Sequence, residues 1–144
     1  MTLTQFINQY DKLNSIVLLE GKRIVADRDW EQLTALGKLL ASEGKNIIFR
    51  SGNAPGADHY ISLGVAGVDP KRLQVITPYK GHKQKTNLAH ETFSLDEIDI
   101  VAEPRAVYLS KQSKKTEKLI DKYVSSNVDK YSIKAAYIIR DTIK

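Results

Sequence analysis

The chain has 144 residues, of which 42% are hydrophobic and 27% charged. This composition is typical of a soluble globular protein, and the length predicts a single domain over residues 1–144. The absence of cysteine excludes a disulfide-framed module, a cysteine nucleophile and a thiolate metal site. No apolar run is long enough to cross a membrane, and residues 1–10 do not resemble a secretory signal, so we expect a cytoplasmic protein without a membrane partner.

The positive charge lies in the second half of the chain. Residues 1–70 contain 7 Lys or Arg against 8 Asp or Glu, whereas residues 71–144 contain 15 against 9. A basic segment is compatible with partners that carry phosphate, including nucleic acid. It is also common on ordinary solvated helices, which is the interpretation that the charge alone favours.

The first half of the chain alternates between strand and helix patterns. An amphipathic helix with Thr2 and Gln5 as a capping box is followed by a short apolar run that indicates a strand buried on both faces. A longer helix then begins at an N-cap, Asp29, and ends at Gly44 in a left-handed conformation. The predicted strands are residues 15–19, 46–50 and 73–76, and a third helix ends near Gly67.

The pattern is weaker after residue 77. Residues 78–83 are expected to form a loop, and residues 94–104 an irregular segment in which Leu95, Ile98 and Ile100 pack against the protein. Residues 111–123 and 129–142 have helical spacing. The last helix has no stop signal, which suggests that a further strand follows in a longer chain.

The alternating order predicts an α/β fold, a three-layer Rossmann-like domain with a largely parallel sheet. Parallel neighbours need crossover connections, which the predicted helices supply. Right-handed crossovers place the loops that follow the strands at one edge of the sheet, where open α/β sheets bind their ligands.

The loop that follows the second strand is the most informative stretch, Arg50-Ser-Gly-Asn-Ala-Pro-Gly-Ala-Asp58. Gly52 permits a sharp turn, and the N–H groups at the start of the next helix predict an anion site suited to phosphate. The predicted backbone donors are Gly52, Asn53, Gly56 and Ala57. The alternative is a turn that binds nothing, which is equally compatible with a glycine motif.

Two side chains complete this predicted site. Arg23, in the loop after the first strand, is expected to clamp a phosphate or carboxylate, the alternative being a solvated arginine. Asp58 is expected to cap backbone amides near the helix dipole, with contact to a ribose or base as the alternative.

Together these stretches resemble the SLOG superfamily of Rossmann-like domains, which includes the Lonely-guy phosphoribohydrolases, the DNA-processing protein A fold and the small bacterial YspA-like proteins. The pattern is G-[ST]-R after the first strand and S-G-G-x-x-G-x-D after the second. The matching residues are Gly21, Arg23, Ser51, Gly52, Gly56 and Asp58. Lys22 replaces the small hydroxyl residue and Asn53 the second glycine.

The resemblance covers residues 15–80 and implies a site for a nucleotide or nucleotide-derived ligand at the carboxyl edge of the sheet. Lonely-guy enzymes also carry a second glycine-rich loop, P-G-G-x-G-T-x-x-E, whose glutamate serves catalysis. No such string occurs in this chain. The catalytic residues of a hydrolase are therefore not identified.

The remaining candidates lie outside these loops. Tyr79 is expected to stack on a base, although the composition of residues 78–83 alone favours a plain basic surface loop. The three histidines have no zinc-site spacing, so neither a metal nor a cofactor is predicted. A basic stripe on a predicted helix is a candidate contact for nucleic acid, although a solvated helix surface is the favoured interpretation; it consists of Lys111, Lys114, Lys115, Lys118 and Lys122.

Three functions therefore compete. We rank first a non-catalytic protein that binds a nucleotide-like phosphate ligand, second a nucleoside-monophosphate phosphoribohydrolase, and third a single-strand nucleic-acid binder of the DNA-processing type. A homodimer is expected only by analogy with proteins of this kind.

Overall fold

The computed structural model describes residues 1–125 and 132–144, which form two compact units. The first unit comprises Met1–Val75 and Lys83–Thr92, and the second comprises Ile76–His82 and Phe93–Lys144. Each unit has its own hydrophobic core. The single domain expected from the length stays a prediction.

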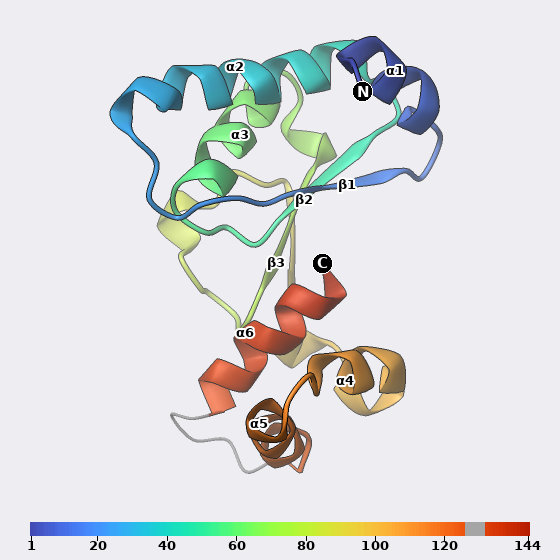
Figure 1. Cartoon of the computed structure of the whole chain (residues 1–144), viewed down its shortest axis with the longest axis vertical. Helices are drawn as coiled ribbons and strands as arrows, with labels where there is room; N and C mark the ends of the chain where they lie inside the picture. The colour runs from blue at the N-terminus through green and yellow to red at the C-terminus, as the bar shows by residue number, and fades with distance from the viewer. Residues whose placement is uncertain (126–131) are drawn as a thin grey trace. The chain divides into compact units, whose positions relative to one another are not determined.

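The secondary structure alternates between strands and helices in the first unit and is mainly helical in the second (Figure 1). The helices are α1 (Leu3–Tyr10), α2 (Asp27–Glu43), α3 (Ala57–Ala66), α4 (Pro104–Ser110), α5 (Lys114–Val124) and α6 (Ser132–Ile143). The strands are β1 (Ile16–Leu19), β2 (Ile48–Ser51), β3 (Leu73–Thr77) and β4 (Glu91–Ser94). Short 3-10 helices cover Pro70–Arg72, Gln84–Thr86, Leu95–Glu97 and Ile100–Ala102.

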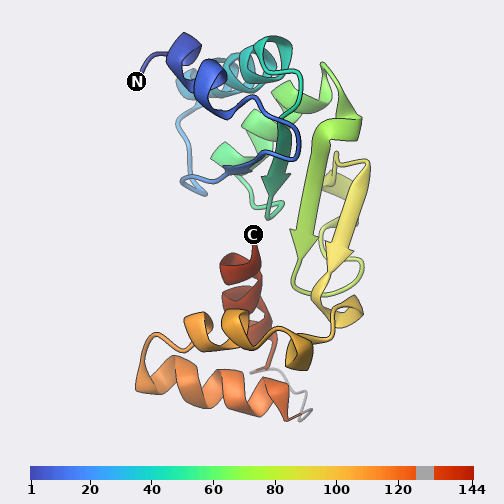
Figure 2. The same cartoon turned by 90° about the vertical axis from the view of Figure 1, so that its right-hand side faces the viewer.

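The four strands form one parallel sheet in the order β1-β2-β3-β4. Ile16 pairs with Ile48 across β1 and β2, and Phe49 pairs with Leu73 across β2 and β3. Because neighbouring strands follow one another along the chain, right-handed crossovers bring α2 and α3 to the same face of the sheet. Figures 1 and 2 show both helices on that face. The predicted α/β class and parallel sheet are confirmed, and the helices flanking the sheet are consistent with a Rossmann-like fold.

Two glycines allow α2 and α3 to pack with their backbones in contact. A Cβ atom built on Gly64 would lie 2.0 Å from the carbonyl oxygen of Thr34, and one built on Gly37 would lie 2.1 Å from the carbonyl oxygen of Ile61. Both distances are far shorter than any normal contact. The helix α3 contacts β1 and β2 as well as α2. The close packing of the two helices therefore sets the position of α2 relative to these strands.

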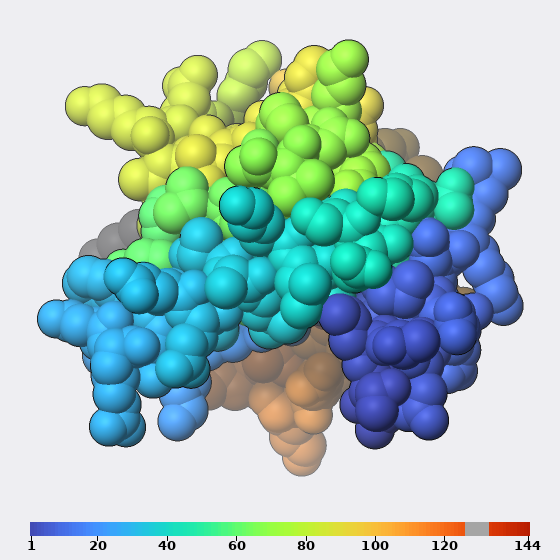
Figure 3. All heavy atoms as spheres, turned by 90° about the horizontal axis from the view of Figure 1, so that it is seen from above, coloured from blue at the N-terminus to red at the C-terminus, as the bar shows by residue number. Residues whose placement is uncertain are grey.

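The core of the first unit lies between the sheet and these helices. Its fully buried members include Ile47, Phe49, Val65 and Leu73. Part of α1 also packs against this core and contacts α2. Figure 3, which looks down on the outer face of α2, shows α1 beside the C-terminal end of that helix. The predicted capping box of α1 is present.

Strand β1 is less buried than the sequence predicted. The apolar run indicated burial on both faces, but Ile16 is 48% exposed and Leu18 39% exposed. The reason is that β1 lies at the edge of the sheet. Leu18 is in register with Arg50, whose guanidinium donates to Gln74 Oε1 from both Nε and Nη2. The face that contains Leu18 is therefore partly polar.

The ends of α2 also differ from the prediction. The helix begins at Asp27, and its N-cap, Ala26, makes no side-chain hydrogen bond, so Asp29 is not the cap. Gly44 has a φ of −83° and continues in extended backbone instead of adopting the left-handed conformation. Asp27 and Asp29 lie in the first turn of α2, where their negative charges interact favourably with the positive end of the helix dipole.

Two elements were not predicted from the sequence, the strand β4 and the helix α4. Strand β4 has only four residues, three of them exposed, so no apolar pattern indicated it. The irregular segment before α4 behaves as expected, because Leu95 and Ile100 are buried and Ile98 packs against the same core. The predicted start of the last helix, residue 129, lies outside the described residues.

None of the described helices has the length and apolar character that a membrane span requires.

The turn between α1 and β1 is held by the carboxylate of Asp11. Its two oxygens accept hydrogen bonds from the N–H groups of Lys45 and Asn46, at 3.0 and 2.6 Å. These two bonds lower the pKa of Asp11 below its ordinary value of 3.8. The stability they contribute is therefore present above that value and is lost as the pH falls through the lower pKa of the folded state.

We expect Asp11→Asn to reveal this contribution. An amide has a single acceptor oxygen and cannot accept both bonds in the same way. Thermal unfolding should show the variant melting below the wild-type protein near neutral pH. The difference should narrow as the pH falls below about 4, where the wild-type carboxylate takes up a proton. A difference that stays constant across this range would contradict the assigned role.

Candidate functional site

The loops that follow β1 and β2 lie side by side in the first unit. The N–H group of Ala57 donates to the carbonyl oxygen of Lys22 at 3.0 Å. In the opposite direction, the N–H group of Gly21 donates to Asp58 Oδ1 at 3.1 Å. The expected proximity of the two motifs is thus confirmed, and two hydrogen bonds between distant parts of the chain maintain it.

The close approach of these loops requires glycine at two motif positions. Gly56 has a φ of +83°, and a Cβ atom there would lie 2.3 Å from the carbonyl oxygen of Lys22 and 2.4 Å from that of Arg23. A Cβ atom on Gly21 would lie 2.5 Å from Cβ of Ala57. Glycine at these two positions therefore allows the two loops to pack directly against each other.

Two of the four predicted backbone donors are already bonded within the protein, which corrects the prediction. Ala57 donates to Lys22, and the N–H group of Asn53 donates to Ser51 Oγ at 3.1 Å. Gly52 also has an interaction partner. Buried backbone amides are almost always paired, and here the neighbouring loop and side chain supply the acceptors. Within the described residues, the N–H group of Gly56 makes no hydrogen bond.

Asn53 maintains the shape of the turn. Its φ of +53° lies in the left-handed region, which asparagine tolerates better than most residues. Its side chain is buried, and Nδ2 donates to the carbonyl oxygen of Lys83 at 3.2 Å. Asn53 therefore stabilises the turn and connects it to Lys83 in the same unit.

Asp58 has the capping role that the sequence favoured, but toward a different partner. It is 3% exposed, and its carboxylate accepts from Gly21 in the loop after β1. The acid thus connects the first turn of α3 to the neighbouring loop. Its contact with a ribose or base stays a prediction.

Two cationic residues have their backbone at this junction. Lys22 and Arg23 belong to the loop that contacts Gly56 and Ala57, and both are exposed. Neither forms an ion pair with any residue in the described part of the chain. Both residues precede α2 in the chain and adjoin the N-terminus of α3, whose dipole adds positive potential.

A pocket of about 570 Å³ opens beside this junction. It lies between the loop after β1, the first half of α2 and the start of α3, and most of its walls are apolar. The lining residues are Lys22, Ile24, Val25, Ala26, Asp29, Gln32, Leu33, Leu36 and Ala57.

Sequence reasoning missed most of this pocket. Of the residues predicted to bind the ligand, only Ala57 lines it. The apolar residues Ile24 and Val25 directly after a basic loop were the available signal. Ile24 is 90% exposed, an unusual position for an isoleucine without a partner.

The remaining predicted residues lie in the second unit. Tyr79 is 41% exposed and packs edge-to-face against buried His82, with ring centroids 5.0 Å apart. His82 in turn lies 3.4 Å from the hydroxyl of Tyr137 on α6. The stacking of Tyr79 on a base stays a prediction.

An ion-pair cluster occupies the end of α6. The carboxylate of Asp141 contacts both the guanidinium of Arg140 and Nζ of Lys144, and both cationic side chains are 3% exposed. Burial raises the pKa of Asp141, but the hydrogen bonds from Arg140 and Lys144 outweigh it and lower that pKa overall. The carboxylate therefore stays ionised at neutral pH and compensates the two buried cations.

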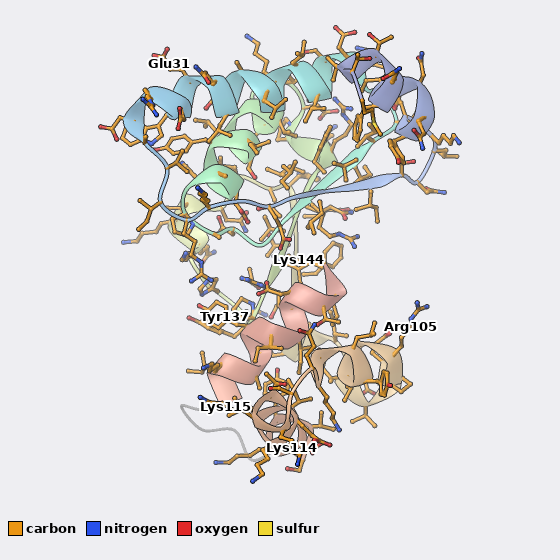
Figure 4. The ribbon with its side chains drawn as sticks, in the orientation of Figure 1. Glu31, Arg105, Lys114, Lys115, Tyr137 and Lys144 are labelled. Carbon is orange, nitrogen blue, oxygen red and sulfur yellow. The ribbon has the colours of Figure 1, made fainter. Side chains whose placement is uncertain are left out.

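Most of the predicted lysine stripe lies on α5, and Lys111 precedes that helix. Lys111 forms an ion pair with Asp121, so it is part of the protein's own packing. Lys114, Lys115 and Lys118 are exposed and have no ion pair with a described residue. Figure 4 shows Lys114 and Lys115 at the first turn of α5. This arrangement fits the solvated helix surface that the sequence favoured.

Comparisons with known proteins add no family to this description. No protein-family model, curated protein or solved structure matches the chain. Among the described residues, no group of three or more histidine and acidic side chains is placed to hold a metal ion. The resemblance to SLOG proteins therefore rests on the two loop motifs and stays a prediction.

Proposed function

We propose that the first unit binds a nucleotide or a nucleotide-derived phosphate ligand at the two paired loops, without turning it over. The observation that supports this proposal is the pair of hydrogen bonds that connects the loop after β1 to the first turn of α3. It holds the backbone of Lys22 and Arg23, two exposed cationic residues, beside the N-terminus of a ten-residue helix, and Lys22 also lines a pocket.

The chemistry of the junction suits a phosphate group. Arginine can make two parallel hydrogen bonds to phosphate, and lysine supplies a compact positive charge. Since the amides of Asn53 and Ala57 are bonded within the protein, these cations replace the predicted amide cradle as the main source of affinity. The volume of the pocket lies within the range of about 300–1,000 Å³ usual for small-molecule sites.

A non-catalytic role fits the residues better than hydrolysis. Asp58 is the acid within the loop motifs, and its carboxylate is buried and bonded to Gly21. The glutamate-bearing loop of the Lonely-guy enzymes is absent from the sequence.

Isothermal titration with a panel of nucleoside monophosphates and sugar phosphates tests the proposal. We expect the double variant Lys22→Ala, Arg23→Ala to bind at least about tenfold more weakly than the wild-type chain, since each lost charged hydrogen bond is worth about 1.5–3 kcal/mol. Lys12→Ala, which removes an exposed lysine from the turn before β1, should bind normally. No heat with any member of the panel, or equal loss in both variants, would refute the proposal. Release of free base during the titration would instead indicate a hydrolase.

A further inference from the structure

An apolar groove lies between α2 and α3 in the first unit. It has a volume of about 350 Å³ and shares no lining residue with the pocket beside the paired loops. Its walls include Trp30 on α2 and Leu63 on α3, which are 39% and 42% exposed. Trp30 stacks on Tyr60, with ring centroids 5.2 Å apart and an angle of 19° between the rings. Aromatic side chains that are exposed and held in place by a neighbour are typical of contacts between proteins.

Two opposite charges border this groove. Glu31 and Lys38 line it from α2, and both are exposed. They are seven residues apart, which is about two helical turns, so they lie on the same face of the helix. Figure 4 shows Glu31 on the outer side of α2. Among the described residues, neither side chain forms an ion pair, and Lys38 has no acidic residue three or four positions away on α2.

The middle of the groove can admit another helix. Thr34 and Ala35 lie midway between the two charges, and both have small side chains. Leu63 lies at the same level, because the next residue, Gly64, packs against the carbonyl oxygen of Thr34. A second α2 that crosses this point in the antiparallel direction places its Lys38 opposite Glu31 and its Glu31 opposite Lys38. A copy of the same chain therefore matches the charges of the groove without any change.

We infer that this groove is the interface of a homodimer, in which α2 of one protomer packs antiparallel to α2 of its partner about a two-fold axis. In such an interface the same surface of both protomers is used, and each contact occurs twice. The two Glu31–Lys38 pairs set the antiparallel register, while Trp30 and Leu63 lose exposed apolar surface. The interface does not depend on the proposed phosphate site.

Charge reversal with sedimentation analysis tests the pairing. Glu31→Lys and Lys38→Glu should each raise the dissociation constant of the dimer at least about tenfold, because like charges then face each other at two places. The double variant, which exchanges the two charges, should dimerise as the wild-type chain does. An equimolar mixture of the two single variants should form a heterodimer, since every pair across its interface is again of opposite charge. The control is Glu43→Lys, the same charge change at an exposed position of α2 outside the groove, which should dimerise normally.

The fluorescence of Trp30 tests the face that is used. It is the single tryptophan of the chain, so its emission responds to this groove. The emission should shift to shorter wavelength on dimerisation and return on dilution. A chain that stays monomeric at high concentration, with constant emission, would overturn the inference and leave the groove to a partner of different sequence. A dimer with unchanged emission, formed equally well by both single variants, would use another surface and would also overturn it.

Discussion

Gly64→Ala should destabilise the protein by about 3 kcal/mol or more, although alanine favours a helix over glycine by about 1 kcal/mol. The added methyl would lie 2.0 Å from the carbonyl oxygen of Thr34 and 2.6 Å from the backbone nitrogen of Lys38. Both atoms belong to the backbone of α2, so no side-chain rotation can relieve the clash. The two helices must separate, which exposes part of the core. Denaturant unfolding followed by circular dichroism measures the loss.

Gly67→Ala is the matched control for this substitution. It lies at the C-terminal end of α3, and a Cβ atom there would meet nothing closer than 3.4 Å. Its φ of −68° suits any residue. We expect its stability to stay within about 0.5 kcal/mol of the wild-type value. If Gly64→Ala proved as stable as Gly67→Ala, the two helices would not be in backbone contact.

Arg72→Met is expected to lower the free energy of unfolding by about 2–4 kcal/mol, because it leaves buried carbonyl groups without hydrogen-bond donors. The guanidinium of Arg72 donates to the carbonyl oxygens of Gly44 and Ala41, at the C-terminal end of α2. It also pairs with Asp69 at 3.3 Å and lies 5.7 Å from the ring centroid of Phe49. The side chain is only 13% exposed, so water cannot readily replace these contacts. Methionine preserves much of the apolar stem and removes every donor.

Arg72→Lys should recover only part of this loss. A single ammonium group lacks the planar fork that reaches two carbonyls and a carboxylate at once. Arg28→Met serves as the control, because Arg28 is 88% exposed and its only ion pair among the described residues, with Asp29, is 3.7 Å long. Chemical denaturation should show a change below about 0.5 kcal/mol for this variant. Equal losses at both arginines would show that Arg72 does not stabilise the end of α2.

The elements with a regular hydrophobic pattern were predictable from the sequence, and those defined by tertiary packing were not. The helix α3 and strands β2 and β3 appear close to their predicted positions, because their apolar residues reach a common core. Strand β4 has no apolar pattern, and α4 is a seven-residue helix that begins at Pro104. The edge position of β1 depends on the strand order, which periodicity does not contain.

The candidate site was predictable in its location and less so in its chemistry. The strand order and the glycine spacing placed the loops after β1 and β2 together, and the structure confirms this. Whether an amide is free or bonded depends on the exact course of a neighbouring loop. The acceptor for Ala57 is a carbonyl 35 residues away, at Lys22, so nothing local could indicate it.

The two hydrogen bonds that join the loops have a consequence for how this site can change during evolution. Backbone atoms supply three of their four ends, and the fourth is the carboxylate of Asp58. The exposed side chains of Lys22, Arg23 and Ile24 can therefore be exchanged without breaking either hydrogen bond. A lineage that keeps Gly21, Gly56 and Asp58 can change the surface chemistry of the loop at those three positions while the connection between the two loops stays the same.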